Sequence, residues 1–443
     1  MWLLLACRPP IEGDGPSIRQ LAVDPTDVPQ VFRVSFETDV DATARVAFGT
    51  DGAAPTLEVT DGGGTAHALL VAGLPAGTTA ALAISASDAR GTTEAPIALV
   101  DVPPLGPDAP VPALLVPPDD RSVGGWTLLD VNVNGTGTLQ ALLVDPQGRV
   151  VWRYDPRKGE DVGAVDVQLT PDDTLLVAGS VPEGQRPVEL GLDGEVVWEG
   201  LEQPAFEADG FMHHHTDPVG GGHVFLEKDV RGGRRGDRVV VRDRDGTERY
   251  RWSTWDHWEV PPDEVEWTHL NWVDLRDDVL YLSDQHSSTI WKIDRATGAP
   301  IWAMGEGRDF TLVGGAWFSG QHAPEWGPDG RLWVYDNGRG RGRTRVVAYV
   351  VDEGARTVTE DFVWDGGAEW GWYEGYWGDV DVLPGGNLLI AAGTPDTRRV
   401  TEVDPATGDV VAAFALPRPF AFYRASRIDP ARFGLRAIAG GTD

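Results

Sequence analysis

The sequence predicts an all-β protein in which a small β-sandwich is followed by a six-bladed β-propeller over residues 113–443. Two repeated sequence motifs, the first and the second phrase, indicate the propeller. The first is a Pro/Gly/Asp turn before an apolar strand, found at 171–173, 220–222, 277–278, 328–330 and 384–386. The second is a glycine followed by a strand that ends in an aromatic residue, at Trp152, Trp198, Trp252, Trp302, Trp364 and Phe414. These aromatic residues recur every 46 to 62 residues, which is near the length of one four-stranded blade, so six phrases predict six blades.

The sandwich is expected over residues 16–102. Strands with alternating apolar residues, such as 31–36, 44–48 and 80–86, are separated by short Gly, Asp and Thr turns, a pattern typical of two packed sheets. The stretch 67–78 resembles the E–F corner of fibronectin type III modules, although Ala80 stands where the usual corner tyrosine would be. The Pro-rich segment 103–112 is interpreted as a stiff linker to the propeller.

The single cysteine predicts where the protein resides. Cys7 follows the apolar run Met1 to Ala6, and the residues Leu4-Leu5-Ala6-Cys7 resemble a bacterial lipobox. Residues 1–15 are therefore interpreted as a lipoprotein-type signal remnant and tether. We expect an exported protein, periplasmic or on the cell surface, that reaches a membrane only through a lipid on Cys7.

Composition narrows the possible partners but leaves the oligomeric state open. The 443 residues carry a net charge of -32, which suits a soluble acidic protein. Such a charge argues against a nucleic acid or an anionic membrane surface as a partner.

Three histidines share one position in the repeat. His214, His269 and His322 each stand eight or nine residues before the end of a turn of the first phrase, where other repeats carry Val165 and Gly378. The innermost strands of a propeller line its axis, so residues at one register on consecutive blades meet at the centre. The sequence therefore predicts a histidine site on the axis.

Several motifs together resemble the bacterial arylsulfate sulfotransferases. They span most of residues 113 to 430 in the family's order: His213-His214 before a Gly turn, Trp267 to Asn271, Tyr281 to Asp294, Gln321 to Pro324, Tyr335 to Gly338, Pro384 to Leu388, Thr401 to Asp404 and Tyr423 to Ala425. The family's members are exported propeller enzymes with a small β-domain at the N-terminus. They move a sulfuryl group from one phenol to another by a ping-pong mechanism.

The resemblance implies roles for the three histidines. His322 would be the nucleophile that forms a sulfohistidine, His269 the general acid and base, and His214 a ligand of the sulfuryl oxygens. No nucleotide donor, metal or other cofactor is implied, and the partners would be a phenolic sulfate and a phenol. Further residues expected to bind the substrate are Gln285, Asn271, His286, Gln321, Asn337, Arg424 and His215.

One position departs from the family pattern. The family's Ser-x-Arg reads Ser283-Asp284-Gln285 here, so an uncharged amide replaces a guanidinium that would pair with the sulfate. His286, Arg424 and Arg339 are the candidate replacements. An aromatic cluster in the connection after His322, which contains Trp364, Trp370, Trp372, Tyr373, Tyr376 and Trp377, is a candidate wall for the aryl group.

Two other functions fit the same residues. His214, His269 and His322 with Gln285 would also suit a metal-dependent propeller lyase or hydrolase. The missing arginine is equally compatible with a propeller that binds a ligand without catalysis.

Overall fold

The computed structural model describes residues 9–133, 139–155, 165–179 and 183–438, and this part of the chain is almost entirely β. The predicted all-β class is therefore confirmed. Its described helices are short: α1 (Thr254–His257), α2 (Gly367–Trp370) and the 3-10 helix η1 (Pro430–Phe433). None of them has the length and apolar character that crossing a bilayer requires. Cys7 lies outside the described residues.

The N-terminal region folds as two sheets. One contains β1 (Ile18–Pro25), β2 (Phe32–Thr38) and β5 (Ala66–Val71), and the other contains β3 (Thr43–Thr50), β4 (Leu57–Thr60), β6 (Thr79–Ser87), β7 (Thr92–Glu94) and β8 (Ala98–Asp101). Buried residues alternate along β6, as expected for a strand with one face in a core.

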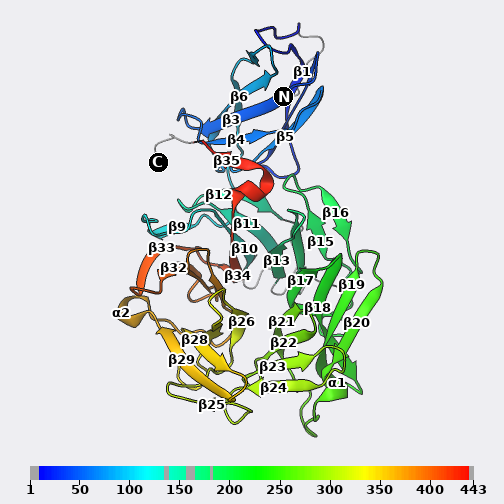
Figure 1. Cartoon of the computed structure of the whole chain (residues 1–443), viewed down its shortest axis with the longest axis vertical. Helices are drawn as coiled ribbons and strands as arrows, with labels where there is room; N and C mark the ends of the chain where they lie inside the picture. The colour runs from blue at the N-terminus through cyan, green and yellow to red at the C-terminus, as the bar shows by residue number, and fades with distance from the viewer. Residues whose placement is uncertain (1–8, 134–138, 156–164, 180–182, 439–443) are drawn as a thin grey trace.

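The C-terminus returns to this region. Strand β35 (Leu435–Ala437) pairs with β4, so the last described strand extends the sandwich sheet rather than the expected propeller range 113–443 (Figure 1). The apolar core is also continuous from the sandwich into the next two sheets, through Trp126 and Trp152. The sandwich is thus packed onto the rest of the molecule.

Six sheets follow, which together form what we call the ring. Each sheet is given from its innermost strand outward: the first contains β34 (Phe420–Ile428), β10 (Trp126–Val133), β11 (Leu139–Val144) and β12 (Val150–Tyr154), and the second contains β13 (Val165–Leu169), β14 (Leu175–Gly179), β15 (Val188–Leu190) and β16 (Val196–Glu199). The third contains β17 (Met212–Val219), β18 (Gly222–Arg231), β19 (Arg234–Asp243) and β20 (Glu248–Ser253), and the fourth contains β21 (Leu270–Arg276), β22 (Val279–Asp284), β23 (Thr289–Asp294) and β24 (Pro300–Met304). The fifth contains β26 (His322–Trp326), β27 (Leu332–Asp336), β28 (Arg345–Asp352) and β29 (Thr357–Trp364), and the sixth contains β30 (Asp379–Val382), β31 (Leu388–Ala392), β32 (Arg399–Asp404) and β33 (Asp409–Ala415). Two edge strands, β25 (Thr311–Leu312) and β9 (Ala113–Val116), extend the fifth and sixth sheets.

The ring closes on itself. The innermost strands contact one another in the order β34, β13, β17, β21, β26 and β30, and β30 contacts β34 again. Closure joins the first and last strands of the ring in sequence, because β34 pairs with β10, and Figure 1 shows the sheets arranged around a common centre. Residues at the start of the innermost strands are thereby brought together.

The aromatic residue of the second phrase lies on the outermost ring strand of every sheet. Four of these residues donate the indole N–H to a backbone carbonyl in the next sheet: Trp152 to Leu192 at 2.7 Å, Trp198 to Arg244 at 2.8 Å, Trp252 to Gly298 at 3.0 Å and Trp364 to Gly408 at 3.1 Å. The indole nitrogen of Trp302 is buried without a partner. The phrase therefore recurs because it joins one sheet to the next.

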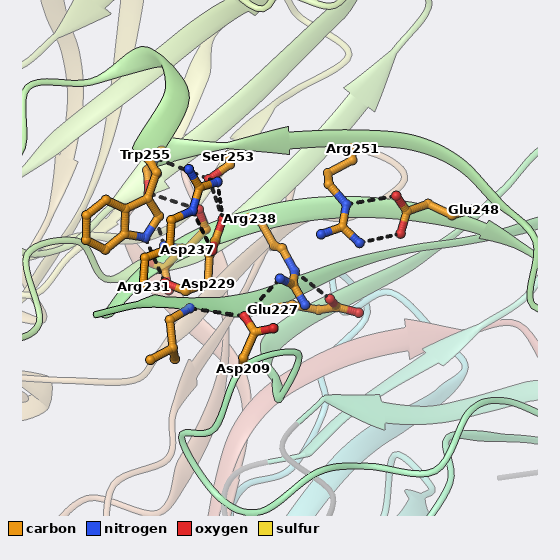
Figure 2. Close-up of polar contacts among 12 residues, drawn as sticks. Asp209, Glu227, Asp229, Arg231, Asp237, Arg238, Glu248, Arg251, Ser253 and Trp255 are labelled. Atoms are coloured by element: carbon orange, nitrogen blue, oxygen red, sulfur yellow. Dashed lines mark hydrogen bonds and ion pairs between the residues drawn. The ribbon is translucent and has the colours of Figure 1, made fainter. Parts of the chain in front are cut away.

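The third sheet carries charged pairs on both faces. On one face Arg238 bridges Glu227 at 2.8 Å and Asp209 at 2.9 Å (Figure 2). Lys228 and Asp237 stand opposite each other on β18 and β19, and successive residues of a strand point to opposite faces. The ion pair between Lys228 and Asp237, at 3.1 Å, is buried on the face of the third sheet that lies toward His269 of the fourth sheet.

Candidate active site

The structure brings the three predicted histidines together. His214 is on β17, His269 immediately precedes β21 and His322 begins β26. The Nε2 atoms of His214 and His269 are 3.1 Å apart. The ring of Tyr423 on β34 packs edge-on against His214 and His322, with centroid separations of 5.9 and 6.0 Å. One aromatic side chain thus lies between two of the histidines.

Each histidine stands at an irregularity of its innermost strand. The strand register shifts between Met212 and Thr216, between Leu270 and Trp272, and between His322 and Glu325. His214 has a φ of 58° and Ala323 a φ of 43°, backbone conformations that non-glycine residues rarely adopt. Such bulges redirect side chains and are common beside active sites, so the backbone here is shaped to present the histidines.

Buried carboxylates from the preceding sheet hold two of these bulges. Asp166 accepts from the backbone N–H of Thr216 at 2.9 Å, and Asp237 accepts from that of Leu270 at 2.8 Å. Asp237 also accepts from the Thr268 hydroxyl at 2.8 Å. Because a buried carboxylate needs hydrogen-bond donors, each one fixes the backbone next to a histidine.

The hydrogen bonds of His322 determine its tautomer. Its Nδ1 is 2.7 Å from Oδ1 of Asn337, while Nδ2 of Asn337 donates to the carbonyls of Glu374 and Trp377 at 3.0 and 2.8 Å. Two carbonyls require the amide N–H groups, so the amide oxygen faces the imidazole and Nδ1 carries the proton. Burial lowers the pKa of His322 to about 3. His322 is therefore neutral, with a free electron pair on Nε2.

His214 and His269 belong to a longer series of side chains in contact with one another. Nδ1 of His214 is 2.8 Å from Nδ1 of His213, and Nε2 of His213 is 3.1 Å from Oδ1 of Asp237, although the two atoms do not form a hydrogen bond. At the other end, Nδ1 of His269 is 3.3 Å from Oε1 of Glu266. We call the series Asp237, His213, His214, His269 and Glu266 the histidine chain.

A buried lysine joins the two ends of the histidine chain. Lys228 donates to Asp237 at 3.1 Å and to Glu266 at 2.8 Å. Burial lowers the pKa of Lys228, but the two carboxylates raise it further, so the net shift is upward. Lys228 is therefore a fixed positive charge behind the histidines.

Two predicted substrate ligands have their amides turned to the protein. Nδ2 of Asn271 donates to the Gln321 carbonyl at 2.7 Å, and Nε2 of Gln321 donates to the Ser283 hydroxyl at 3.0 Å. Both side chains are buried. They join the fourth and fifth sheets, which positions His269 relative to His322.

The remaining predicted ligands surround the histidine chain. His286 stacks on His269 with centroids 5.0 Å apart, and His215 stacks on Trp272 at 4.2 Å with Nδ1 2.9 Å from Asp166. Gln285 is buried and donates its backbone N–H to the His269 carbonyl at 3.0 Å. Gln285, the position at which the resemblance led us to expect an arginine, is therefore directly beside His269.

The guanidinium groups of the two candidate replacement arginines, Arg424 and Arg339, have other partners. Arg424 is buried between the rings of Tyr423 and Trp272, with its guanidinium carbon 4.8 and 4.5 Å from their centroids. It lines a cavity on the axis together with three carboxylates, Asp130, Asp379 and Asp381. Arg339 is exposed and donates to the Gly375 carbonyl at 2.9 Å.

The aromatic cluster is divided between several places. Trp364 and Trp372 are buried in the core between the fifth and sixth sheets, whereas Tyr373 and Tyr376 are 49% and 48% exposed. Trp377 packs beside Tyr423 with centroids 6.1 Å apart. Trp377 and Tyr423 are thus the aromatic pair at the histidines, and the predicted wall of six residues is not formed as one surface.

The carboxylates and the lysine of the histidine chain were missed by sequence reasoning. Asp237, Glu266 and Lys228 belong to none of the motifs, yet Lys228 is one of only three lysines in the sequence. A lysine in the middle of an apolar strand of so acidic a protein was the available signal.

The histidines form a chain and do not surround one point. Within the described ranges, no group of three or more His, Cys, Asp or Glu side chains has the arrangement that a metal ion needs. The geometry offers imidazole nitrogens for proton transfer and for nucleophilic attack.

A closed all-β ring with histidines at its centre defines a propeller-like protein with a histidine-based site. The family model for arylsulfotransferase (ASST) matches residues 123–424, which include five innermost strands of the ring and the first part of the sixth, β34. The chain belongs to this family. Its members are enzymes that transfer sulfuryl groups between small molecules.

Other comparisons add only distant likenesses. None of the curated proteins matches the chain. Solved structures with similar chain paths include the β-propeller domain of Myceliophteria thermophila Cps50 (Swd1), with 12% identity over 68% of this chain and 88% of that one at a TM-score of 0.38. A chain of the nidogen/laminin complex has 14% identity over 68% and 97% at 0.40, and Kuenenia stuttgartiensis hydrazine synthase has 13% over 79% and 92% at 0.38.

Proposed function

We propose that the protein transfers a sulfuryl group from a phenolic sulfate ester to a phenol through a sulfohistidine at His322, without a nucleotide donor or a cofactor. The observation that carries this proposal is the pairing of His322 with Asn337, which leaves Nε2 free and unprotonated. A neutral imidazole is a competent nucleophile. We interpret the six sheets as the blades of a six-bladed propeller and the N-terminal region as a fibronectin-like sandwich, in an exported protein anchored through Cys7.

In the first half-reaction, Nε2 of His322 attacks sulfur and forms the N–S bond. The bond between sulfur and the aryl oxygen breaks, and its electron pair stays on that oxygen. His269 gives its proton to the departing oxygen, so a neutral phenol leaves. The second half-reaction reverses these steps, with His269 taking the proton of the incoming phenol.

The other residues act on the charge of the sulfuryl group. Sulfuryl transfer resembles phosphoryl transfer, in which catalysis depends on in-line placement and on donors to the equatorial oxygens. His214 adjoins His269 and supplies such a donor. The aromatic pair Trp377 and Tyr423 supports the aryl ring.

The assay uses p-nitrophenyl sulfate with and without a second phenol. We expect nitrophenol release to be much faster with the acceptor, and to persist in a chelator. Release that a chelator abolishes would contradict the proposal and favour a metal-dependent enzyme. Absence of release would favour a ligand-binding protein.

Substitution of the nucleophile completes the test. His322→Asn should reduce transfer by about four orders of magnitude or more, as for other enzymes that lose a nucleophile. The control is His257→Asn, because His257 is exposed and stacks on Trp252 on the outer strand of its sheet. The control variant should keep full activity.

A further inference from the structure

We propose that Glu374 is a positioning residue for the nucleophile: its buried carboxylate holds the connection 371–378 in place, and this connection fixes the tautomer of His322 through Asn337. The consequence for sulfuryl transfer rests on the function proposed above. The effect on the tautomer concerns the free protein and is measured without any substrate.

The carboxylate of Glu374 is bound by two sheets. The residue is 2% exposed. Its Oε1 accepts from the backbone N–H and the hydroxyl of Thr394 at 3.0 and 2.7 Å, and its Oε2 accepts from the Tyr335 hydroxyl. Tyr335 belongs to β27 of the fifth sheet, and Thr394 follows β31 of the sixth. Because a buried carboxylate needs such donors, these bonds hold the connection between the two sheets.

The main chain of Glu374 binds the partner of the nucleophile. Its carbonyl accepts from Nδ2 of Asn337 at 3.0 Å, and its N–H donates to the Thr344 hydroxyl at 2.8 Å. The second carbonyl that accepts from Nδ2 of Asn337 is that of Trp377, three residues further along the same connection. Both acceptors that orient the Asn337 amide therefore come from one short segment, which the Glu374 carboxylate anchors.

The position of this segment determines which nitrogen of His322 carries the proton. With both carbonyls in place, Asn337 presents its oxygen to Nδ1 of His322. An amide that turns over exchanges its oxygen and its nitrogen. If the connection moved away, the Asn337 nitrogen could face the imidazole, and the proton would then reside on Nε2. Nε2 would have no free electron pair with which to attack sulfur.

The same carboxylate also positions the aromatic pair. Trp377 belongs to the anchored connection, and its ring packs beside that of Tyr423. Thr394, which donates to the carboxylate, follows Gly393, whose carbonyl accepts the N–H of Phe422 at 2.9 Å. Phe422 precedes Tyr423 in β34. One buried group is thus connected to the tautomer of the nucleophile and to both aromatic rings beside it.

The direct test is nitrogen-15 NMR of the free protein labelled in histidine, because protonated and unprotonated ring nitrogens differ in chemical shift. The spectrum of His322→Asn identifies the signals of His322. We expect wild-type His322 to carry its proton on Nδ1, and Glu374→Leu to move a large part of the population to the tautomer protonated on Nε2. An unchanged tautomer in folded Glu374→Leu would overturn the proposal.

Two milder variants keep the test valid if Glu374→Leu does not fold. Tyr335→Phe removes one donor to the carboxylate and the acceptor of the Trp372 indole N–H, which lies 2.8 Å from the Tyr335 oxygen. We expect the same change of tautomer to a smaller extent. Glu374→Gln keeps an oxygen for Thr394 and should retain most of the wild-type tautomer. A wild-type tautomer in Tyr335→Phe would contradict the proposal.

Kinetics separate the tautomer from the aryl contact. At saturating p-nitrophenyl sulfate, Glu374→Leu should slow the first release of nitrophenol by roughly tenfold to a hundredfold, which is a usual cost of misplacing a reacting group by about 1 Å. Trp377→Leu removes the ring but keeps the main-chain carbonyl, so it should raise KM and leave the tautomer unchanged. A change of tautomer in Trp377→Leu would contradict the role assigned to the carbonyls.

Glu402→Leu is the matched control. Glu402 is 1% exposed on β32 of the sixth sheet and accepts from the Ser122 hydroxyl at 2.9 Å and from Nδ2 of Asn387 at 2.7 Å. Its loss should cost stability but leave the tautomer and the first release of nitrophenol unchanged. A changed tautomer in this variant would show that any loosened sheet has the same effect, which would overturn the proposal.

Failure of the proposed function gives a different result. A wild-type protein that carries the expected tautomer, loses it in Glu374→Leu and transfers no sulfuryl group would support the positioning role and contradict the proposed reaction.

Discussion

Nε2 of His269 lies 3.1 Å from Nε2 of His214, although the two residues are 55 positions apart and come from adjacent sheets. Contacts between sheets therefore determine the geometry of the site. A change that loosens one sheet from the next should affect stability and activity together.

The tryptophan contacts between sheets provide a stability prediction. Trp252→Phe should lower the free energy of unfolding by about 1 kcal/mol more than Trp302→Phe, because only Trp252 donates its indole N–H to the next sheet. Both rings are buried, with exposures of 2% and 1%, so the loss of packing is matched. Urea unfolding measures the difference, and equal losses would show that the hydrogen bond contributes nothing.

Asn337→Asp should make the enzyme sensitive to acid. A carboxylate next to Nδ1 favours the imidazolium and raises the pKa of His322 from its value of about 3. Activity requires neutral His322, so the loss of kcat/KM on acidification should begin at a higher pH than in the wild type. An unchanged acid limb would mean that Asn337 does not control the protonation of His322.

Gln285→Arg should raise sulfuryl transfer, because it restores a fixed cation beside His269. The kcat/KM for transfer from p-nitrophenyl sulfate to a phenol measures the effect. A drop in transfer on introducing the arginine would mean that the pocket binds another group.

Acid should also destabilise the fold through His322. The pKa of His322 is lowered from 6.5 to about 3 in the folded protein. The stability that neutral His322 contributes is therefore fully present above pH 6.5 and is lost as the pH falls toward 3. His322→Gln should therefore flatten the dependence of stability on pH in this range. Urea midpoints between pH 7 and 4 test this, with the exposed His257→Gln as the control that keeps the wild-type slope.

The convergence of His214, His269 and His322 was predictable because a repeated sheet places equal registers at equal positions. In the sixth sheet, Gly378 occupies the position that corresponds to these histidines. A Cβ on Gly378 would lie 2.1 Å from the ring of Tyr335, and the residue has a φ of 105°. The repeat indicates where a position lies, but not which side chain the neighbouring sheet can accommodate.

The partners of these histidines were not predictable in the same way. Asp237 reaches the site from β19, the third strand of its sheet, and Glu266 reaches it from the segment before β21. The bulge at His214 also breaks the alternation on which sequence reasoning depends. The six aromatic residues near Trp377 looked like one group because they are close in sequence. The connection folds between two sheets, so their side chains go to the core, the surface and the site.

The most direct test of the account is to trap the covalent intermediate. The protein is mixed with p-nitrophenyl sulfate in the absence of a phenol acceptor, quenched at alkaline pH and examined by peptide mass spectrometry. We predict a burst of nitrophenol equal to the enzyme present and one added sulfuryl group on the peptide that contains His322, absent from His322→Asn. A burst with the sulfuryl group on another residue, or transfer to a phenol with no modified peptide, would contradict His322 as the nucleophile.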